Sequence, residues 1–273
     1  MVNPIKDRDV HGVLNPPCQR KAYWIMRLSI VGCFVGHGVF GLLKKPQWLH
    51  YLTIVQLSPY WADKICPWVG VMDITLAASI LFYPTRAVLL WMVFWTVWTA
   101  LLRPLAGEGI WEFFERAGNY GMPLAFLVFR GQGSLSPAKP VLDRVILILK
   151  ISTGLLLIGH GGFSAVQSKE MLIRHYASIG IFLTRPALAL IGWFEILLGV
   201  GIILRPLRSL LIFIFFWKIG TELLYPLSGA PFWEFVERSS SYGAPLALFF
   251  LLSPIPFHLP RRQHDPAQRD KER

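Results

Sequence analysis

The stretches WEFFERAGNYGMPLA at residues 111–125 and WEFVERSSSYGAPLA at residues 233–247 are close copies of each other, 122 residues apart. Extended to Thr99–Ala125 and Thr221–Ala247, the two windows are identical at 16 of 27 positions. Self-similarity at a fixed spacing is the signature of a duplicated structural unit. We therefore expect the chain to consist of two copies of one unit.

The similarity extends toward the N-terminus, where a shift of 123 residues places Gly36-His37-Gly38 on Gly159-His160-Gly161. The 273 residues are 54% hydrophobic, with a mean hydropathy of +0.48, and apolar runs alternate with short polar loops. This composition is typical of a membrane protein. Runs near the ~20 residues that cross a bilayer predict spans at 22–43, 66–83, 86–102, 111–130, 144–166, 186–204, 207–224 and 233–253.

We predict an all-α integral membrane protein of about eight transmembrane helices, arranged as two parallel four-helix repeats. An even number of crossings in each copy gives both copies the same orientation. The chain divides into a cytoplasmic N-terminal segment (1–21), a first four-helix membrane repeat (22–130), a cytoplasmic linker (131–143), a second four-helix membrane repeat (144–254) and a cytoplasmic disordered tail (255–273).

The distribution of basic residues predicts the orientation. The side that includes both chain ends carries 17 of the 27 Lys and Arg residues, against 9 on the other side, with Lys218 inside a span. The positive-inside bias then predicts a multi-pass protein of the cell membrane with both termini cytoplasmic. The same bias explains the net charge of +11, so we expect the lipid bilayer as a partner and no nucleic acid.

One candidate buried polar site comprises charged and histidine side chains at a shared depth. At 1.5 Å per residue, His37 and Asp73 lie about 9–11 Å from the outer ends of their predicted spans. His160, Glu195 and Lys218 lie at the same depth in the second copy. Buried charges need partners, so we expect His37 to pair with Asp73, and His160 to pair with Glu195 and Lys218. Hydrogen bonds that only fix helix register are the alternative.

A candidate outer-face site follows from the duplicated stretch itself. Acidic and basic residues recur there at spacings of three and four, which places them on one helix face. Helix capping and pairing between helices could account for them without any ligand. Two prolines, Pro123 and Pro245, are expected to kink or restart this helix. The members of the face are Glu112, Glu115, Arg116, Glu234, Glu237 and Arg238.

The two copies are not equivalent. Lys218 and Glu222 correspond to Thr96 and Ala100 in the first copy, so only the second copy can form this ion pair. Three cysteines without a CxxC spacing give no metal site. The motifs GxSxG, HExxH and the P-loop are absent, so no hydrolase or nucleotide-driven pump is indicated.

The chain resembles the DoxX-like family of small four-helix bacterial membrane proteins. The resemblance rests on a His-Gly in the first helix, a G-x-x-acid-x-x-x-small pattern in the second and an arginine that opens the third. These are His37-Gly38 and His160-Gly161, then Gly70, Asp73, Ala77 and Gly192, Glu195, Gly199, and finally Arg86 and Arg208. The tandem fusion and the W-E-F-x-E-R segments depart from the family pattern.

The resemblance implies a membrane subunit tied to quinone-linked or oxidative-stress redox metabolism, because a relative serves a quinone-reducing thiosulfate oxidoreductase. A quinone would then be the cofactor, and a redox partner subunit would carry electrons. The residues themselves leave two alternatives open, a small-solute or ion transporter and a non-catalytic membrane assembly factor. Whether the chain is an enzyme is left open at this point.

Overall fold

The computed structural model describes residues 16–130 and 137–252, in which helices are the only regular secondary structure. The predicted N-terminal segment and tail, and the first part of the predicted linker, lie mostly outside them. The first half contains α1 (Pro16–Leu42), α2 (Pro46–Ile54), α3 (Pro59–Phe82), α4 (Arg86–Leu105), α5 (Trp111–Glu115) and α6 (Ala117–Arg130). The second half contains α7 (Lys139–Ala165), α8 (Glu170–Ala177), α9 (Arg185–Leu204), α10 (Arg208–Leu227), α11 (Trp233–Glu237) and α12 (Ser239–Leu251).

Five helices are long and apolar enough to cross a membrane. They are Pro17–Leu42, Pro59–Phe82, Arg86–Leu105, Arg185–Leu204 and Arg208–Leu227. Their outward faces carry large exposed apolar side chains, among them Trp68, Leu197 and Phe216. Such a surface is costly in water and favourable in lipid. The chain is therefore an all-helical membrane protein.

Local sequence sets where the long helices begin. The Ser58 hydroxyl accepts a hydrogen bond from the backbone N–H of Trp61, and Pro59 occupies the first helical position. Both features favour a helix start, so α3 begins well before the predicted residue 66. Thr85 and Thr184 cap α4 and α9 in the same way.

The last segment of each half is broken into two helices, at Arg116 and at Arg238, and not at the prolines as predicted. The backbone N–H of Arg116 donates to the Phe114 carbonyl, and the Arg116 guanidinium donates to the Glu112 carbonyl at 3.3 Å. A continuous helix would have given that carbonyl to the backbone N–H. The break is repeated at Arg238, whose guanidinium donates to the Glu234 carbonyl at 3.0 Å.

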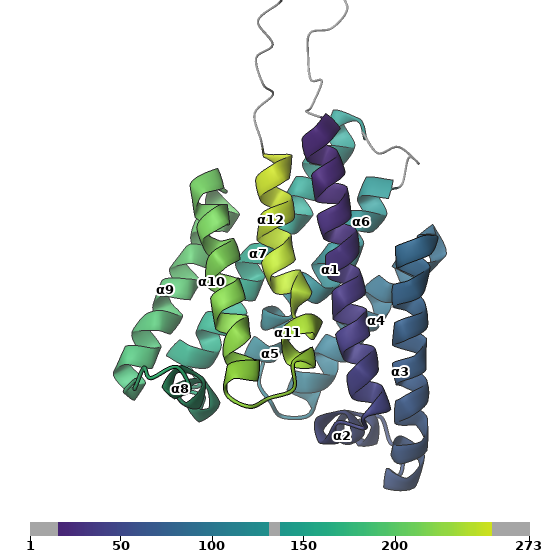
Figure 1. Ribbon diagram of the computed structural model, residues 1–273, viewed down its shortest axis with the longest axis vertical. Helices are drawn as coiled ribbons and strands as arrows, with labels where there is room; N and C mark the ends of the chain where they lie inside the picture. Colours follow the sequence, from purple (N-terminus) through teal and green to yellow (C-terminus); the bar gives the residue numbers. More distant parts are fainter. Residues whose placement is uncertain (1–15, 131–136, 253–273) are drawn as a thin grey trace, which may run out of the picture.

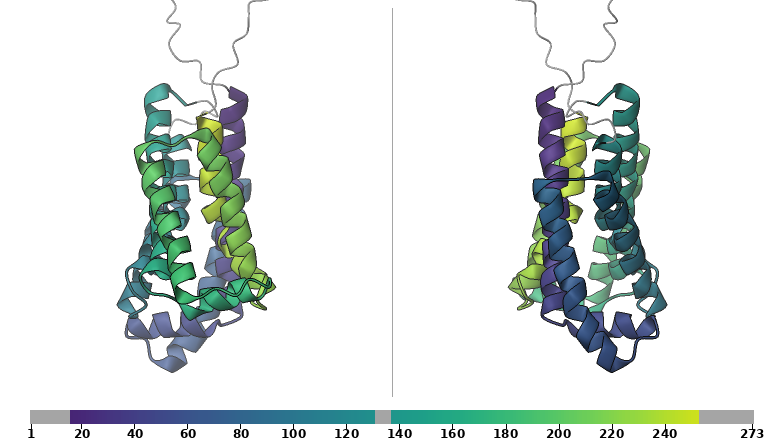
Figure 2. Two further views of the ribbon diagram at one scale, coloured as in Figure 1. Left: turned by 90° about the vertical axis from the view of Figure 1, so that its left-hand side faces the viewer. Right: turned by 90° about the vertical axis from the view of Figure 1, so that its right-hand side faces the viewer.

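The two halves are interlocked. Helix α1 packs on α3, and α7 packs on α9, but α11 and α12 of the second half pack on α1, while α5 and α6 of the first half pack on α7. Glycines permit the close approach, since Gly36 faces the Glu237 backbone and Gly159 faces the Glu115 backbone. The start of α1 and the end of α12 lie at one end of the bundle, and α2 and α8 lie across the other (Figures 1 and 2).

Candidate functional site

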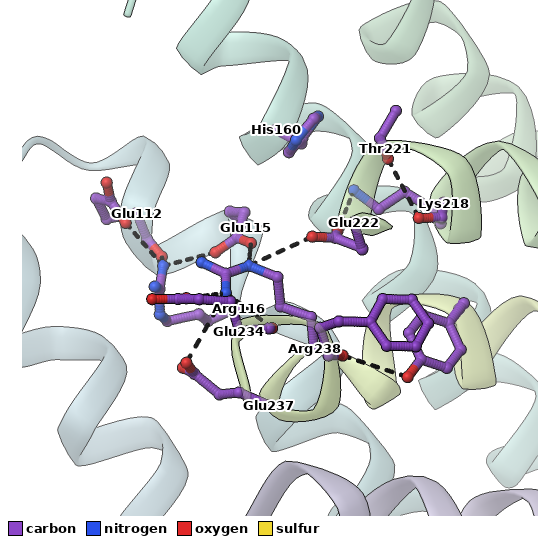
Figure 3. A network of polar contacts seen from close by, with 12 residues as sticks. Glu112, Glu115, Arg116, His160, Lys218, Thr221, Glu222, Glu234, Glu237 and Arg238 are labelled. Atoms are coloured by element: carbon purple, nitrogen blue, oxygen red, sulfur yellow. Dashed lines mark hydrogen bonds and ion pairs between the residues drawn. The ribbon is translucent and has the colours of Figure 1, made fainter. Parts of the chain in front are cut away.

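Charged side chains of α5, α11 and the arginines that follow them converge in one cluster (Figure 3). The cluster lies toward the end of the bundle that α2 and α8 cover (Figure 1). Arg116 Nη1 lies 2.7 Å from Glu112 Oε2 and 2.6 Å from Glu115 Oε2. All three side chains are buried. Glu112 and Arg116, four residues apart on the predicted helix face, therefore form an ion pair, and Glu115 adds a second carboxylate to the same guanidinium.

The second half repeats this pairing and connects to the first. Arg238 Nη1 lies 2.5 Å from Glu234 Oε2 and 3.8 Å from Glu237 Oε2. Its Nε lies 3.9 Å from Glu115 Oε1, across the boundary between the halves. The outer-face residues therefore form one cluster and not two separate helix caps.

Two lysines from the connecting loops cross between the halves. Lys45, which precedes α2, lies 2.5 Å from Glu234, and Lys169, which precedes α8, bonds to Glu112. Each ammonium group also lies over a phenylalanine ring of its own half, 4.0 Å and 3.8 Å from the ring centroids of Phe40 and Phe163. Each loop of one half is thereby attached to the broken helix of the other.

The predicted pairing of His160 with Glu195 is confirmed. His160 Nδ1 lies 2.7 Å from Glu195 Oε2, and the Trp217 indole donates to Glu195 Oε1 at 2.8 Å. Both carboxylate oxygens of the fully buried Glu195 therefore have partners, as a charge inside a membrane requires.

The predicted pairing of His37 with Asp73 is wrong. His37 Nε2 lies 3.1 Å from Glu237 Oε1, because the contact at Gly36 brings α11 of the other half against α1. Asp73 is fully buried beside the Trp95 indole, the counterpart of the Trp217 indole that donates to Glu195, and no cation among the described residues pairs with it.

Lys218 also differs from expectation, since it does not join His160 and Glu195. Its ammonium group lies 2.6 Å from Glu222 Oε1, and both side chains are completely buried. Glu222 Oε2 lies 3.3 Å from Arg238 Nε, and the Arg238 guanidinium also stacks on the Tyr225 ring at 3.9 Å. The two predicted sites are therefore joined, through Glu222 to Arg238 and through His37 to Glu237.

A cavity of about 370 Å³ lies beside this cluster. Side chains from both halves line it, including Trp48 of α2 and Met171 of α8. Its walls carry as many cations as carboxylates, so it has no field of a single sign. The charged lining residues are Lys45, Arg103, Arg116, Lys169 and Arg238, and Glu108, Glu112, Glu115, Glu170 and Glu234.

Most residues of the cavity wall belong to neither predicted site, among them Tyr51, Arg103 and Glu108. The Tyr51 hydroxyl donates to Glu108 and accepts from Arg103 Nη1 at 3.0 Å. Burial raises the pKa of the Tyr51 phenol above its usual value, although Arg103 opposes the shift. Tyr51 is therefore a donor at neutral pH. A repeat comparison could have flagged Arg103, because Tyr225 replaces it in the second half.

A second, apolar cavity near His37 is much smaller, about 40 Å³, and Trp48 and Trp95 contribute to its wall. Among the described residues, no three His, Cys, Asp or Glu side chains converge as a metal site would require. No protein-family model, curated protein or solved structure matches the chain. The functional argument therefore depends on the geometry of the site.

Proposed function

We propose that this chain is an eight-crossing membrane protein of two parallel repeats that binds a small polar solute in the charged cavity and passes it across the membrane. Besides the five apolar helices, α7 supports a further crossing, since its 27 residues pack along α9 as α1 packs along α3. The broken pairs α5–α6 and α11–α12 complete the count.

The cavity between the halves is the observation that carries the proposal. Its volume of about 370 Å³ falls within the range of small-molecule sites, roughly 300–1,000 Å³. Charges placed at membrane depth typically mark solute and ion pathways. Broken helices beside such a site are common in transporters, where they present backbone groups and helix ends to the solute.

The balance of charges indicates the kind of solute. Every carboxylate in the cluster already has a cation beside it, so a solute with one charge would leave a buried group unpaired. A small zwitterion can replace both members of a pair at once. The excess of basic residues on the side of the chain ends further supports cytoplasmic termini in the cell membrane, with the cavity facing outward.

The test uses two lysines that are adjacent in the chain, of which only Lys45 lines the cavity. Lys45 lines the cavity and pairs with Glu234, whereas Lys44 pairs with Asp63 of its own half at 2.7 Å and does not line it. Purified protein is screened by thermal shift against zwitterionic, anionic and cationic small solutes, and hits are tested for flux into liposomes. We expect a zwitterion to raise Tm and to be taken up, with both effects lost in Lys45→Gln and retained in Lys44→Gln.

A screen in which no solute class raises Tm or crosses the liposome membrane would contradict this function. The assembly-factor alternative would then account for the buried charges as structural pairs. Equal loss in Lys44→Gln and Lys45→Gln would likewise count against the cavity as the binding site.

A quinone-linked redox role, which the family resemblance implies, is the second candidate. The observation in its favour is that His37 borders an apolar cavity with two tryptophans. At about 40 Å³, that space is far below the usual size of a ligand site, so the geometry supports the polar solute better. Quinone that co-purifies with the protein and is lost in a His37→Ala, His160→Ala variant would favour the redox role.

A further inference from the structure

A third cavity lies where α3 ends and α4 begins, far from the charged cluster. Its volume is about 540 Å³, and α1, α3, α4 and α6 all contribute to its wall. Three arginines line it, Arg27, Arg86 and Arg130, and no acidic residue does. In contrast to the cavity at the other end of the bundle, this one has a single sign of charge.

The three arginines differ in what holds them. Arg27 is buried and donates from Nε to the Ile80 carbonyl at 2.8 Å and from Nη2 to the Leu81 carbonyl at 2.7 Å. It thereby satisfies two carbonyls at the end of α3, which otherwise lack partners. Arg27 therefore contributes to the cavity wall mainly as a structural residue that holds the end of α3 in place.

Within residues 16–130 and 137–252, the guanidinium groups of Arg86 and Arg130 keep most of their hydrogen-bonding capacity. Arg130 Nη1 donates weakly to the Tyr23 hydroxyl, at 3.3 Å, and Arg86 is exposed at the start of α4. No carboxylate of the described residues lies within ion-pair distance of Arg27, Arg86 or Arg130. A guanidinium without a carboxylate is suited to phosphate, which its fork of N–H groups can bind in bidentate fashion.

The position of the cavity points to a lipid. It lies between the last residue of α3 and the first residue of α4, two of the helices that are apolar enough to cross the membrane. The ends of such helices lie at the headgroup layer. Phe82 and Tyr83 on the cavity wall are 78% and 79% exposed, and exposed aromatic rings favour this layer as well.

We propose that the arginine cavity binds the phosphate headgroup of an anionic phospholipid. Arg86 and Arg130 contact the phosphate, Arg27 supplies a fixed positive wall, and Phe82 and Tyr83 pack against the first part of the acyl chains. Basic pockets between transmembrane helices are a recurring form of lipid site. This inference is independent of the solute that the cavity at the other end binds.

The experiment measures lipid retention. Protein is reconstituted with phosphatidylcholine alone or mixed with phosphatidylglycerol, re-extracted, and analysed by native mass spectrometry during delipidation. We expect wild-type protein to retain phosphatidylglycerol, and an Arg86→Gln, Arg130→Gln variant to bind it about thirtyfold more weakly, at ~1 kcal/mol per arginine. Circular dichroism and gel filtration check that the variant is folded, and Arg27 is left unchanged because it holds the end of α3.

The matched control is Arg208→Gln, because Arg208 is the counterpart of Arg86 in the second half and lies over the Phe249 ring, 4.4 Å from its centroid. We expect this variant to retain phosphatidylglycerol like the wild type. Equal loss in Arg208→Gln would show a diffuse charge effect and overturn the proposal, as would equal retention by the double variant. Inorganic phosphate that displaces the lipid at equal concentration would assign the cavity to a free anion and overturn the lipid assignment.

Discussion

Removal of the Glu222 carboxylate leaves the Lys218 ammonium group buried without a partner. Both side chains have 0% exposure, their charged atoms lie 2.6 Å apart, and no other described carboxylate lies within ion-pair distance of Lys218. A charge stranded in this way costs about 3–5 kcal/mol. We therefore expect Glu222→Leu to lower the free energy of unfolding by that amount.

Removal of the other member of the pair, Lys218, should lower the free energy of unfolding by less. In Lys218→Met, Glu222 keeps a cation, because Arg238 Nε lies 3.3 Å from its other oxygen. The double variant, Lys218→Met with Glu222→Leu, replaces a buried pair with apolar side chains of similar size, which is often nearly neutral. Arg238 still has Glu234 at 2.5 Å. We expect the double variant to be more stable than Glu222→Leu alone, within about 1–2 kcal/mol of the wild type.

The assay is equilibrium unfolding in mixed micelles with an increasing fraction of sodium dodecyl sulfate, followed by far-ultraviolet circular dichroism. All four proteins of the double-mutant cycle are measured under the same conditions, so that the coupling energy is obtained directly. Additive costs of the two single substitutions, or a double variant less stable than Glu222→Leu, would refute the reasoning that the two charges stabilise mainly each other.

Two further predictions concern packing and pH. A Cβ at Gly159 would meet the Glu115 backbone, whereas Gly220 has nothing within 4 Å of its Cβ position. Gly159→Ala should therefore lower the free energy of unfolding by about 1–3 kcal/mol, while Gly220→Ala leaves it unchanged or higher. Equal effects of the two substitutions would contradict the interlocked packing. Burial, reinforced by the positive charge of Arg238, lowers the pKa of His175 in α8 to about 4. In the unfolded chain the His175 imidazole has a pKa near 6.5, so between about pH 4 and pH 6.5 the unfolded state binds more protons than the folded state. The free energy of unfolding should therefore fall as the pH is lowered from about 6.5 toward 4. His175→Gln should make this fall smaller, as measured by unfolding at several pH values.

Local patterns were sufficient to predict the long apolar helices, but not α2 and α8, which lie in connections outside the predicted spans. Apolar runs with few charges, and start signals such as Thr85 before α4, act over a few residues, so the predicted ranges 86–102 and 186–204 lie close to α4 and α9. The break at Arg116 was not predictable in this way. The break depends on the Arg116 side chain, which donates a hydrogen bond to the Glu112 carbonyl of its own helix. The sequence instead suggested a break at Pro123, and that prediction was wrong.

Partners within one half were also accessible to sequence reasoning. His160 and Glu195 share a depth on two spans that are consecutive in the chain, and consecutive helices often pack side by side, so depth and chain order together favoured their contact. The same argument failed for His37, because depth does not say which of several helices at that level comes closest.

The sequence by itself determined the long apolar helices, the duplication and which polar side chains are buried, since these follow from composition, spacing and the cost of charge in lipid. Tertiary structure alone decided which half supplies each partner. The fourth segment of each half packs on the first helix of the other, through Gly36 and Gly159, and this exchange gives His37 to Glu237 and creates the charged cavity. A contact such as that of His37 with Glu237, 200 residues apart in the sequence, depends on the shapes of whole helices, which no local pattern records.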